Sequence, residues 1–321
     1  MRVRPGRGSR PRSRLRPAHS DATGGQIVAV DRGRVTVRLD GDPLCEVVAM
    51  KARELGRRAL AVGDRVGLVG DVSGEPDTLA RVVRVEDRTS VLRRSADDAD
   101  PVERVLVANA DQLVIVTAVA DPEPRPRMID RCLVAAYDAG LVPLLCLTKS
   151  DLGDPAALLA AYAPLRVDAI AVDRVTGADA LRPLLAGRAS VLVGHSGVGK
   201  STLVNALVPG SDRAVGHVNA VTGRGRHTSS SAVALELPGG GWVIDTPGVR
   251  SFGLAHVSPA SVLRAFDDLA PGAENCPRGC SHDEPECALD AWVAAGHADP
   301  ARLDSLRRLL RARTTGDDTG H

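Results

Sequence analysis

This chain of 321 residues is nearly free of lysine, poor in aromatic residues and without a long uninterrupted apolar stretch. None of its apolar runs reaches the roughly 18 residues of a membrane-spanning helix, and the N-terminus lacks the apolar core of a signal peptide. We therefore expect a cytoplasmic protein with no membrane partner. The two residues each of Phe, Trp and Tyr leave few rings on which nucleic-acid bases could stack.

Lysine is scarce among the 41 basic residues, because only Lys51, Lys149 and Lys200 are lysines. Arginine supplies the positive charge everywhere else. Arginine carries a wide planar guanidinium, whereas lysine ends in a compact ammonium on a thin stem, so a pocket closed tightly around a phosphate or a base can require lysine. Lys149 and Lys200 fall within the motifs described below, which makes them functional candidates.

Six cysteines are present, and three of them crowd together with a histidine near the C-terminal end. Disulfides are not expected in a cytoplasmic chain, and Cys45, Cys132 and Cys146 stand singly in apolar surroundings. The cluster offers the ligand set of a closed tetrahedral zinc site, namely Cys276, Cys280, His282 and Cys287. Because no coordination position stays open, one structural Zn²⁺ is predicted; reduced surface cysteines without a metal are the alternative.

The N-terminal part divides into a tail, residues 1–23, and a strand-rich segment, residues 24–95. The first 18 residues are rich in arginine and contain no acidic residue, so a disordered tail is predicted, with or without contact to nucleic-acid phosphate. The strand-rich segment alternates apolar and polar positions between turn signals and predicts a small antiparallel β-barrel of the OB type. Such barrels often bind oligonucleotides, but the lack of aromatic residues leaves open a barrel that only packs.

Residues 96–256 show a different sequence pattern, in which apolar runs at 113–119, 142–147 and 190–193 alternate with helical stretches. Strands that are apolar throughout are buried on both faces, which predicts a parallel sheet sandwiched between helices in an α/β domain. The helices are expected at residues 128–139, 156–163 and 199–207.

Residues 257–321 are polar and predict a mostly helical zinc-binding domain, with helices at 260–269, 288–295 and 300–311. The last helix places its apolar side chains on one face, formed by Leu303, Leu306, Leu309 and Leu310. Its arginines lie elsewhere on the helix. This pattern predicts a solvated amphipathic helix, and contact of the arginines with RNA is the alternative.

A phosphate-binding loop follows the apolar run at 190–193 and leads into a helix. Its pattern comprises Gly194, His195, Ser196, Gly197, Val198, Gly199, Lys200 and Ser201, and Thr202 follows in the helix. Glycines let backbone N–H groups curl around phosphates, Lys200 neutralises the outer phosphates and is a catalytic candidate, and Ser201 is a Mg²⁺ ligand. The loop therefore predicts binding of a nucleoside triphosphate with Mg²⁺.

Two further motifs complete a nucleotide site. Asp245 is predicted to hold Mg²⁺ through water, and Gly248 to sense the γ-phosphate through its N–H. The apolar run at 142–147 is followed by Thr148, Lys149, Ser150 and Asp151. A carboxylate at Asp151 can accept hydrogen bonds from the N1–H and the exocyclic amine of guanine, which adenine cannot offer, so GTP is predicted and an ATP-driven enzyme is disfavoured.

The order of these motifs is permuted, because the guanine-specifying motif precedes the phosphate-binding loop and Asp245 comes last. With the upstream barrel and the downstream Cys/His cluster, this order resembles the RsgA (YjeQ) family of circularly permuted GTPases that depend on the small ribosomal subunit. The resemblance covers nearly the whole chain after the tail. It implies a GTPase with GTP and GDP as ligands, and the 30S subunit with its 16S rRNA as partner.

The same resemblance assigns two switch segments, at residues 223–229 and 245–253. It implies that Thr228, or alternatively Ser229, closes on Mg²⁺ and that His227 helps to place the attacking water. Val249 occupies the place where Ras-like enzymes carry a water-orienting glutamine. Because valine neither donates nor accepts a hydrogen bond, slow intrinsic hydrolysis is expected until a partner orders the switches.

Three features depart from the family pattern. The guanine-specifying motif begins with Thr148 where asparagine is usual, which weakens one contact behind the base. In the family, a further loop contacts the guanine base, and residues 172–177 match it only at their Thr–Gly end. That loop acts mainly through backbone N–H groups. The zinc ligands are spaced more closely on either side of the Cys-x-His core, so each connecting loop is shorter.

The resemblance implies a monomeric GTPase of late 30S maturation, which docks on the subunit with GTP bound and leaves after hydrolysis stimulated by the ribosome. Ordering of the switches is expected to reorient the C-terminal domain against the object that the barrel holds. The alternative is an RNA-binding assembly chaperone in which the nucleotide is only a structural ligand.

Overall fold

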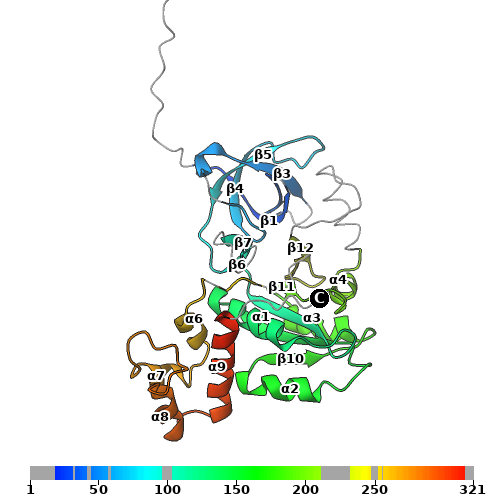
Figure 1. The fold of residues 1–321 in the computed structure, drawn as a ribbon. Helices are drawn as coiled ribbons and strands as arrows, with labels where there is room; N and C mark the ends of the chain where they lie inside the picture. Colours follow the sequence, from blue (N-terminus) through cyan, green and yellow to red (C-terminus); the bar gives the residue numbers. More distant parts are fainter. Residues whose placement is uncertain are drawn as a thin grey trace, which may run out of the picture.

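The computed structural model describes residues 19–31, 33–41, 45–56, 59–95, 103–210, 232–246, 252–254 and 256–314. In Figure 1 an N-terminal barrel stands above a central α/β domain, and C-terminal helices pack against one side of that domain. The predicted succession of a barrel, an α/β domain and a helical region is confirmed. Among the helices of these residues, none combines the length and the apolar character needed to cross a bilayer.

The barrel closes on itself. Its strands are β1 (Thr23–Asp31), β2 (Arg34–Leu39), β3 (Glu46–Lys51), β4 (Arg65–Gly70) and β5 (Ala80–Val85), and a short 3-10 helix, η1 (Arg53–Leu55), follows β3. The strand order is β1-β2-β3-β5-β4, and β4 pairs back with β1. Alternate side chains point inward, so that Ile27, Val37 and Val47 are fully buried. The predicted OB-type barrel is therefore confirmed.

The central domain is built on a parallel sheet with one antiparallel strand. Its strands are β8 (Gln112–Ala118), β9 (Val142–Thr148), β10 (Asp168–Ala171), β11 (Ala189–Val193), β12 (Val233–Glu236) and β13 (Trp242–Asp245). They follow the order β10-β9-β8-β11-β13-β12, and β12 runs antiparallel to β13. Every residue of β8 is buried, as expected for a strand covered on both faces. The predicted parallel sheet is confirmed; the short strands β10 and β12 were not predicted.

The helices that connect these strands are α1 (Pro126–Ala139), α2 (Ala156–Tyr162), α3 (Gly177–Leu185) and α4 (Lys200–Leu207). Three of them lie close to the predicted ranges. The sequence pattern did not predict α3, because a glycine opens this helix and Pro183 interrupts its interior.

A two-stranded hairpin, β6 (Val91–Ser95) and β7 (Glu103–Ala108), joins the barrel to the sheet. Leu92 of β6 and Val107 of β7 belong to the same apolar core as Ile129 of α1. The boundary predicted at residue 95 therefore falls within a hairpin that packs with the central domain.

The C-terminal helices are α6 (Pro259–Leu263), α7 (Ala270–Ala273), α8 (Ala288–Ala294) and α9 (Pro300–Thr314). The helix predicted at 260–269 is shorter than expected and ends at Leu263. The chain then turns, which brings Phe266 and Leu269 into the core, where each is at most 1% exposed. The chain after Leu263 therefore buries these two side chains instead of continuing the helix.

The helix α9 is less solvated than predicted, because Arg302 is buried, Arg307, Arg308 and Arg313 are half-buried, and only Arg311 among these arginines is exposed. The leucine face of α9 is buried in the core shared with α1, as expected. Arg302 is only 3% exposed, and its Nε lies 2.6 Å from a carboxylate oxygen of Asp268. Further ion pairs join Arg307 to Asp290, Arg308 to Asp130 and Arg311 to Asp283. Carboxylates from other segments thus neutralise the charge that the helix was expected to present to solvent or RNA.

Candidate functional site

Three loops meet at one edge of the parallel sheet, where β9, β11 and β13 end. The strand β8 lies between β9 and β11 and pairs with both. The chain therefore continues from β8 to β9 on one side of β8 and later places β11 on the other side. Outside the carboxyl ends of the strands, such a reversal leaves a crevice in which α/β proteins bind their ligands.

The phosphate-binding loop leaves β11 at Gly194 and enters α4 at Lys200. Only glycine fits at Gly194, because a Cβ there would lie 2.4 Å from the carbonyl oxygen of Val116. Gly197 and Gly199 have φ angles of 85° and 89°, which L side chains rarely adopt. The loop therefore places the N-terminal amides of α4 at the crevice, in a position that favours an anion. The predicted ligand residues Ser196, Ser201 and Thr202 are exposed there.

Thr148 joins the guanine-specifying motif to the phosphate-binding loop. Its hydroxyl lies 2.6 Å from the carbonyl oxygen of Val198 and 3.2 Å from that of Thr117. A hydroxyl has one proton and donates to one carbonyl at a time, and the shorter distance favours Val198. Two motifs that are far apart in the sequence are therefore in direct contact.

The rest of the guanine-specifying motif lies at the same edge. Lys149 has a φ of 57°, and its Nζ donates to the backbone carbonyl of Asp121. The N–H of Ser150 donates to the carbonyl of Val172, so the predicted base loop begins beside this motif. The carboxylate of Asp151 is exposed, as a contact to a base edge requires.

Asp245, at the end of β13, lies beside Lys200. The Nζ of Lys200 is 3.0 Å from Oδ1 of Asp245 and 3.1 Å from the carbonyl oxygen of Thr246. Thr246 is fully buried and donates its hydroxyl to the carbonyl of Leu192 at 2.8 Å, which fixes the end of β13 against β11. An ammonium and a carboxylate therefore share one place in the crevice, as the outer phosphates and the Mg²⁺ of a nucleotide require.

His195 lies inside the phosphate-binding loop and is only 6% exposed. Its Nδ1 lies 2.9 Å from the carbonyl oxygen of Ser196, so Nδ1 carries the proton and donates. Burial lowers the pKa of His195, and the positive charge of Arg125 acts in the same direction, against the hydrogen bond to Ser196. The imidazole is therefore neutral at pH 7 and adds no positive charge to the loop.

The loop that follows β8 was not predicted to belong to the site. The carbonyl of Asp121 accepts from Lys149, and a Cβ at Gly197 would lie 3.6 Å from Cδ of Pro122. This loop therefore touches both motifs. The sequence carried a usable signal for this loop, because β8 is mostly apolar and its carboxyl end must lie at the same edge as its parallel neighbours.

Several predicted residues lie outside the described part of the chain. These are Gly248 and Val249 of the second switch, and His227, Thr228 and Ser229 of the first. The assignments made for them therefore stay predictions.

A second candidate site is the Cys/His cluster between α7 and α8. Its ligand atoms, all within 4.8 Å of one another, belong to Cys276, Cys280, His282 and Cys287. The Sγ of Cys276 lies 3.7 Å from Nδ1 of His282 and 3.9 Å from Sγ of Cys287. Ligands at bond lengths of about 2.0 to 2.3 Å in a tetrahedron stand about 3.4 to 3.8 Å apart, so the cluster fits one metal ion. The shorter connecting loops do not prevent the ligands from converging.

Neighbouring side chains hold this cluster in place. His282 has a φ of 67°, and its carbonyl accepts from Nε of Arg307 at 2.8 Å. Both carboxylate oxygens of Glu284 accept from the N–H of Ser281, which holds the pKa of Glu284 at about 2. The backbone of the metal-binding loop is thereby tied to α9 on one side and to its own carboxylate on the other.

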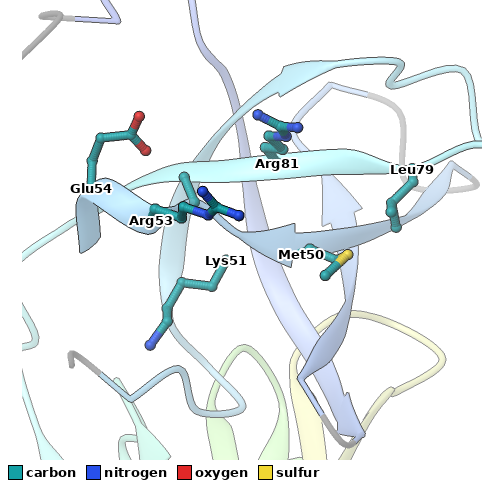
Figure 2. A pocket seen from close by; sticks show the side chains of 7 residues that line it. Met50, Lys51, Arg53, Glu54, Leu79 and Arg81 are labelled. Carbon is teal, nitrogen blue, oxygen red and sulfur yellow. The ribbon is translucent and has the colours of Figure 1, made fainter. Parts of the chain in front are cut away.

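The barrel carries a third feature, an open hollow of about 530 Å³. It is lined by Met50, Lys51, Ala52, Arg53, Glu54, Leu79 and Arg81. Met50 and Leu79 are 43% and 41% exposed, large fractions for apolar side chains. Figure 2 shows Lys51 and Arg81 pointing away from each other, so the positive charge is spread over the surface. Such a surface suits a polyanion better than one small anion.

Comparisons with known proteins agree with this architecture. The model of the RsgA GTPase family matches residues 85–255. The small ribosomal subunit biogenesis GTPase RsgA of Pseudomonas aeruginosa is 46% identical over 215 residues, covering 64% of this chain and 63% of the relative, slightly less than two thirds of its length. The protein of the same name from Gemmatimonas aurantiaca is 38% identical over 267 residues, covering 81% of this chain and 86% of that protein.

A solved structure extends the similarity to the fold. The crystal structure of YjeQ from Thermotoga maritima aligns with a TM-score of 0.66 and 26% sequence identity, and the alignment covers 90% of this chain and 97% of that chain. The range matched by the family model contains the guanine-specifying motif, the phosphate-binding loop and Asp245, in the permuted order that the sequence predicts. This chain therefore belongs to the RsgA GTPase family.

Proposed function

We propose that this protein binds GTP with Mg²⁺ and hydrolyses it to GDP and phosphate. The observation that carries the proposal is the contact of Thr148 with Val198, which puts the guanine-specifying motif against the phosphate-binding loop. Beside that contact, Lys200 and Asp245 lie 3.0 Å apart at the same edge of the sheet. A guanine-selective carboxylate, a ring of amides, an ammonium and a Mg²⁺-directed carboxylate thus border one crevice.

Each residue has a distinct role in this proposal. The amides of residues 194–199 and the ammonium of Lys200 hold the phosphates, and Asp151 accepts from the edge of guanine. The hydroxyl of Ser201 and the carboxylate of Asp245 are hard oxygen donors of the kind that Mg²⁺ prefers. The bound Mg²⁺ would neutralise charge that develops on the phosphates. Thr228 is assigned to the same ion, Gly248 to the γ-phosphate, and His227 to the placing of water.

The partner in this proposal is the 30S ribosomal subunit with its 16S rRNA, in late maturation in the cytoplasm. The names of the relatives support it, since they are called small ribosomal subunit biogenesis GTPases. Val249 gives a physical reason for a partner, because it cannot orient the attacking water. The hollow beside Arg53 and Arg81 gives the barrel a surface for rRNA phosphates. The protein would act as a monomer that docks with GTP and leaves with GDP.

The metal of the Cys/His cluster is proposed to be one Zn²⁺ with a structural role. Three thiolates and an imidazole fill a tetrahedral shell, so no position stays open for a substrate.

The decisive experiment is GTP hydrolysis under multiple turnover, with and without purified 30S subunits. We expect slow hydrolysis alone and stimulation by the subunits. Lys200→Ala should remove both rates while leaving the fold and the metal content unchanged. A rate that does not respond to 30S subunits would refute the ribosomal part of the proposal, and wild-type turnover by the variant would refute the assignment of the phosphate site.

The basic hollow of the barrel also favours a second candidate, an RNA-binding assembly chaperone for which the nucleotide is only a structural ligand. This function requires RNA binding but no turnover. Release of several phosphates per protein molecule in the presence of 30S subunits would exclude it.

A further inference from the structure

In the part of the chain that the structure describes, the barrel touches the central domain at two separate places. At the first, Asn109 donates its side-chain N–H to the carbonyl of Gly63 at 2.9 Å, and Val62 bridges to Val107 of β7. A Cβ at Gly63 would lie only 1.9 Å from the carbonyl oxygen of Ala108, which shows how closely the two backbones approach. This contact anchors the barrel on β7, on the path of the chain that leads to β8.

At the second place, the barrel meets the β12–β13 hairpin. Ala29 of β1 pairs with Val233 of β12, so the strands of the barrel and of the central domain form one continuous sheet. Figure 1 shows β12 between the barrel and the central sheet. Val28, the neighbour of Ala29, is 3% exposed and belongs to the apolar core of the central domain.

Arg38 of β2 connects the same two parts through its side chain. Its Nη1 lies 2.8 Å from Oε2 of Glu236 in β12, and its Nη2 lies 2.7 Å from Oε1 of Glu46 in β3. Its Cζ lies 5.6 Å from the ring centroid of Trp242 in β13. One guanidinium therefore binds carboxylates from both domains and lies over an indole that belongs to the hairpin.

The hairpin has a special position in the chain. The segment assigned to switch I, residues 223–229, ends shortly before β12 begins at Val233. The segment assigned to switch II begins at Asp245, the last residue of β13. Both switches are therefore covalently continuous with the two strands that Arg38 contacts. The strand β7, which forms the first contact, does not adjoin either switch segment in the sequence.

We propose that Arg38 is a positioning residue that couples the barrel to the hairpin between the switches, so that a partner held by the barrel changes the rate of GTP hydrolysis. This inference rests on the proposed function and adds the route by which the partner acts. A barrel anchored at β7 can change its orientation only by moving relative to β12 and Glu236. Conversely, a change in the switches that shifts the hairpin must stretch or relax the same contacts.

The experiment compares Arg38→Ala with two other variants in the hydrolysis assay. Glu236→Gln removes only the carboxylate of the central domain and, because Glu236 is 44% exposed, leaves packing intact. Arg65→Ala is the matched control, because Arg65 pairs with Asp40 wholly within the barrel. We expect all three variants to hydrolyse GTP alone at the wild-type rate. The ratio of stimulated to basal rate should fall about fivefold or more in Arg38→Ala and Glu236→Gln, and not in Arg65→Ala.

Three further comparisons separate coupling from general damage. Co-sedimentation with 30S subunits in a non-hydrolysable GTP analogue should be unchanged in Arg38→Ala, since the barrel surface is intact. Arg38→Lys should restore part of the stimulation, because lysine keeps the positive charge but lacks the planar fork that directs separate N–H groups at the two carboxylates. The double variant Arg38→Ala/Glu236→Gln should lose no more than either single variant.

A readout without ribosomes tests the coupling by itself. Hydrogen–deuterium exchange of the amides around Ala29 should differ between GDP and the GTP analogue in the wild type, and Arg38→Ala should remove the difference. Full stimulation of Arg38→Ala, or no nucleotide-dependent exchange around Ala29 in the wild type, would overturn the inference. A wild-type rate that 30S subunits leave unchanged would instead refute the ribosomal part of the proposed function, and the exchange experiment would still decide the coupling.

Discussion

The hydroxyl of Thr148 joins the two loops that we assign to opposite ends of the proposed nucleotide. The family pattern has asparagine at this position, and the sequence predicted a weakened contact behind the base. In the structure the hydroxyl reaches the carbonyl of Val198 at 2.6 Å, so threonine keeps a link to the phosphate-binding loop. Neither motif taken alone could reveal this bond, because it depends on the approach of two loops in space.

Thr148→Val should lower the free energy of unfolding by about 1 to 3 kcal/mol, because it leaves the buried carbonyl of Val198 without its donor. Valine has the same shape as threonine, so no cavity adds to the loss. Thr148→Ser keeps the hydroxyl and serves as the control. Urea denaturation of the three proteins measures the effect, and equal stability of the valine variant would show that the bond contributes nothing.

Asp151→Asn should lower the affinity for GTP by about 100-fold or more and raise that for xanthosine triphosphate. An amide cannot accept two hydrogen bonds from guanine, but its N–H can donate to the carbonyl that xanthine carries instead of the amine. Asp154→Asn is the control, because Asp154 lies in the same loop and its carboxylate accepts from the N–H of Ala156. Calorimetric titration with both nucleotides gives the answer. Unaltered GTP affinity would remove Asp151 from the site.

Among the elements, α9 shows which features the sequence can predict and which it cannot. The spacing of its leucines predicted the buried face correctly, since helical periodicity is a local property. The partners of its arginines could not be predicted in the same way. Asp268 and Asp130 come from other segments, and only the tertiary fold brings their carboxylates to Arg302 and Arg308.

Arg302→Ala should destabilise the protein by about 3 kcal/mol, because it removes the closer of the two ion-pair partners of the mostly buried Asp268 and leaves only the partly exposed Arg166 at 3.1 Å. Arg311→Ala should cost much less stability, since Arg311 is 64% exposed and its pair with Asp283 is screened by water. Chemical denaturation of the two variants tests this difference. Equal losses would mean that burial does not determine the strength of these pairs.

Removal of the metal should destabilise the C-terminal helices, because the cluster lies between α7 and α8. Cys287→Ser or prolonged chelation should reduce a metal content of about one ion per chain and lower the melting temperature. Cys45→Ser, which alters a thiol in the barrel, should do neither. Elemental analysis and thermal denaturation provide the measurements, and full metal content in Cys287→Ser would contradict the assigned ligand set.

On the scale of the whole molecule, the sequence predicted the succession of domains, the parallel sheet and the placing of three motifs at its edge. These followed from strand periodicity and from the rule that parallel strands end at one edge. The contacts between domains were not predictable. The pairing of Ala29 with Val233 and the bridge formed by Arg38 involve residues whose local patterns carry no sign of a distant partner.

The C-terminal helices and the central domain share one apolar core. It contains Ile129 of α1, Leu306 of α9, and Phe266 from the segment between α6 and α7. A rigid-body reorientation of the C-terminal domain would have to open this core. Movement between the central domain and the barrel would leave the barrel's own core around Ile27 and Val47 intact and would affect the shared core where Val28 and Val62 enter it from the barrel.

The central and C-terminal parts should therefore unfold in a single calorimetric transition. Leu306→Ala should lower this transition, with a cost of about 2 to 5 kcal/mol, and GDP should raise the same transition. Val47→Ala, in the core of the barrel, is the comparison. A separate low-temperature transition of Leu306→Ala that does not respond to GDP would show that the C-terminal helices unfold independently.

Because lysine is scarce, amine-selective reagents can modify the protein at only a few defined positions. Apart from the terminal amine, an acylating reagent or crosslinker can modify only Lys149 and Lys200 in the crevice and Lys51 on the barrel. A nucleotide should shield the first two, while a polyanion on the barrel should shield the third. Mass spectrometry of three peptides would then report separately on the occupancy of both ends of the molecule.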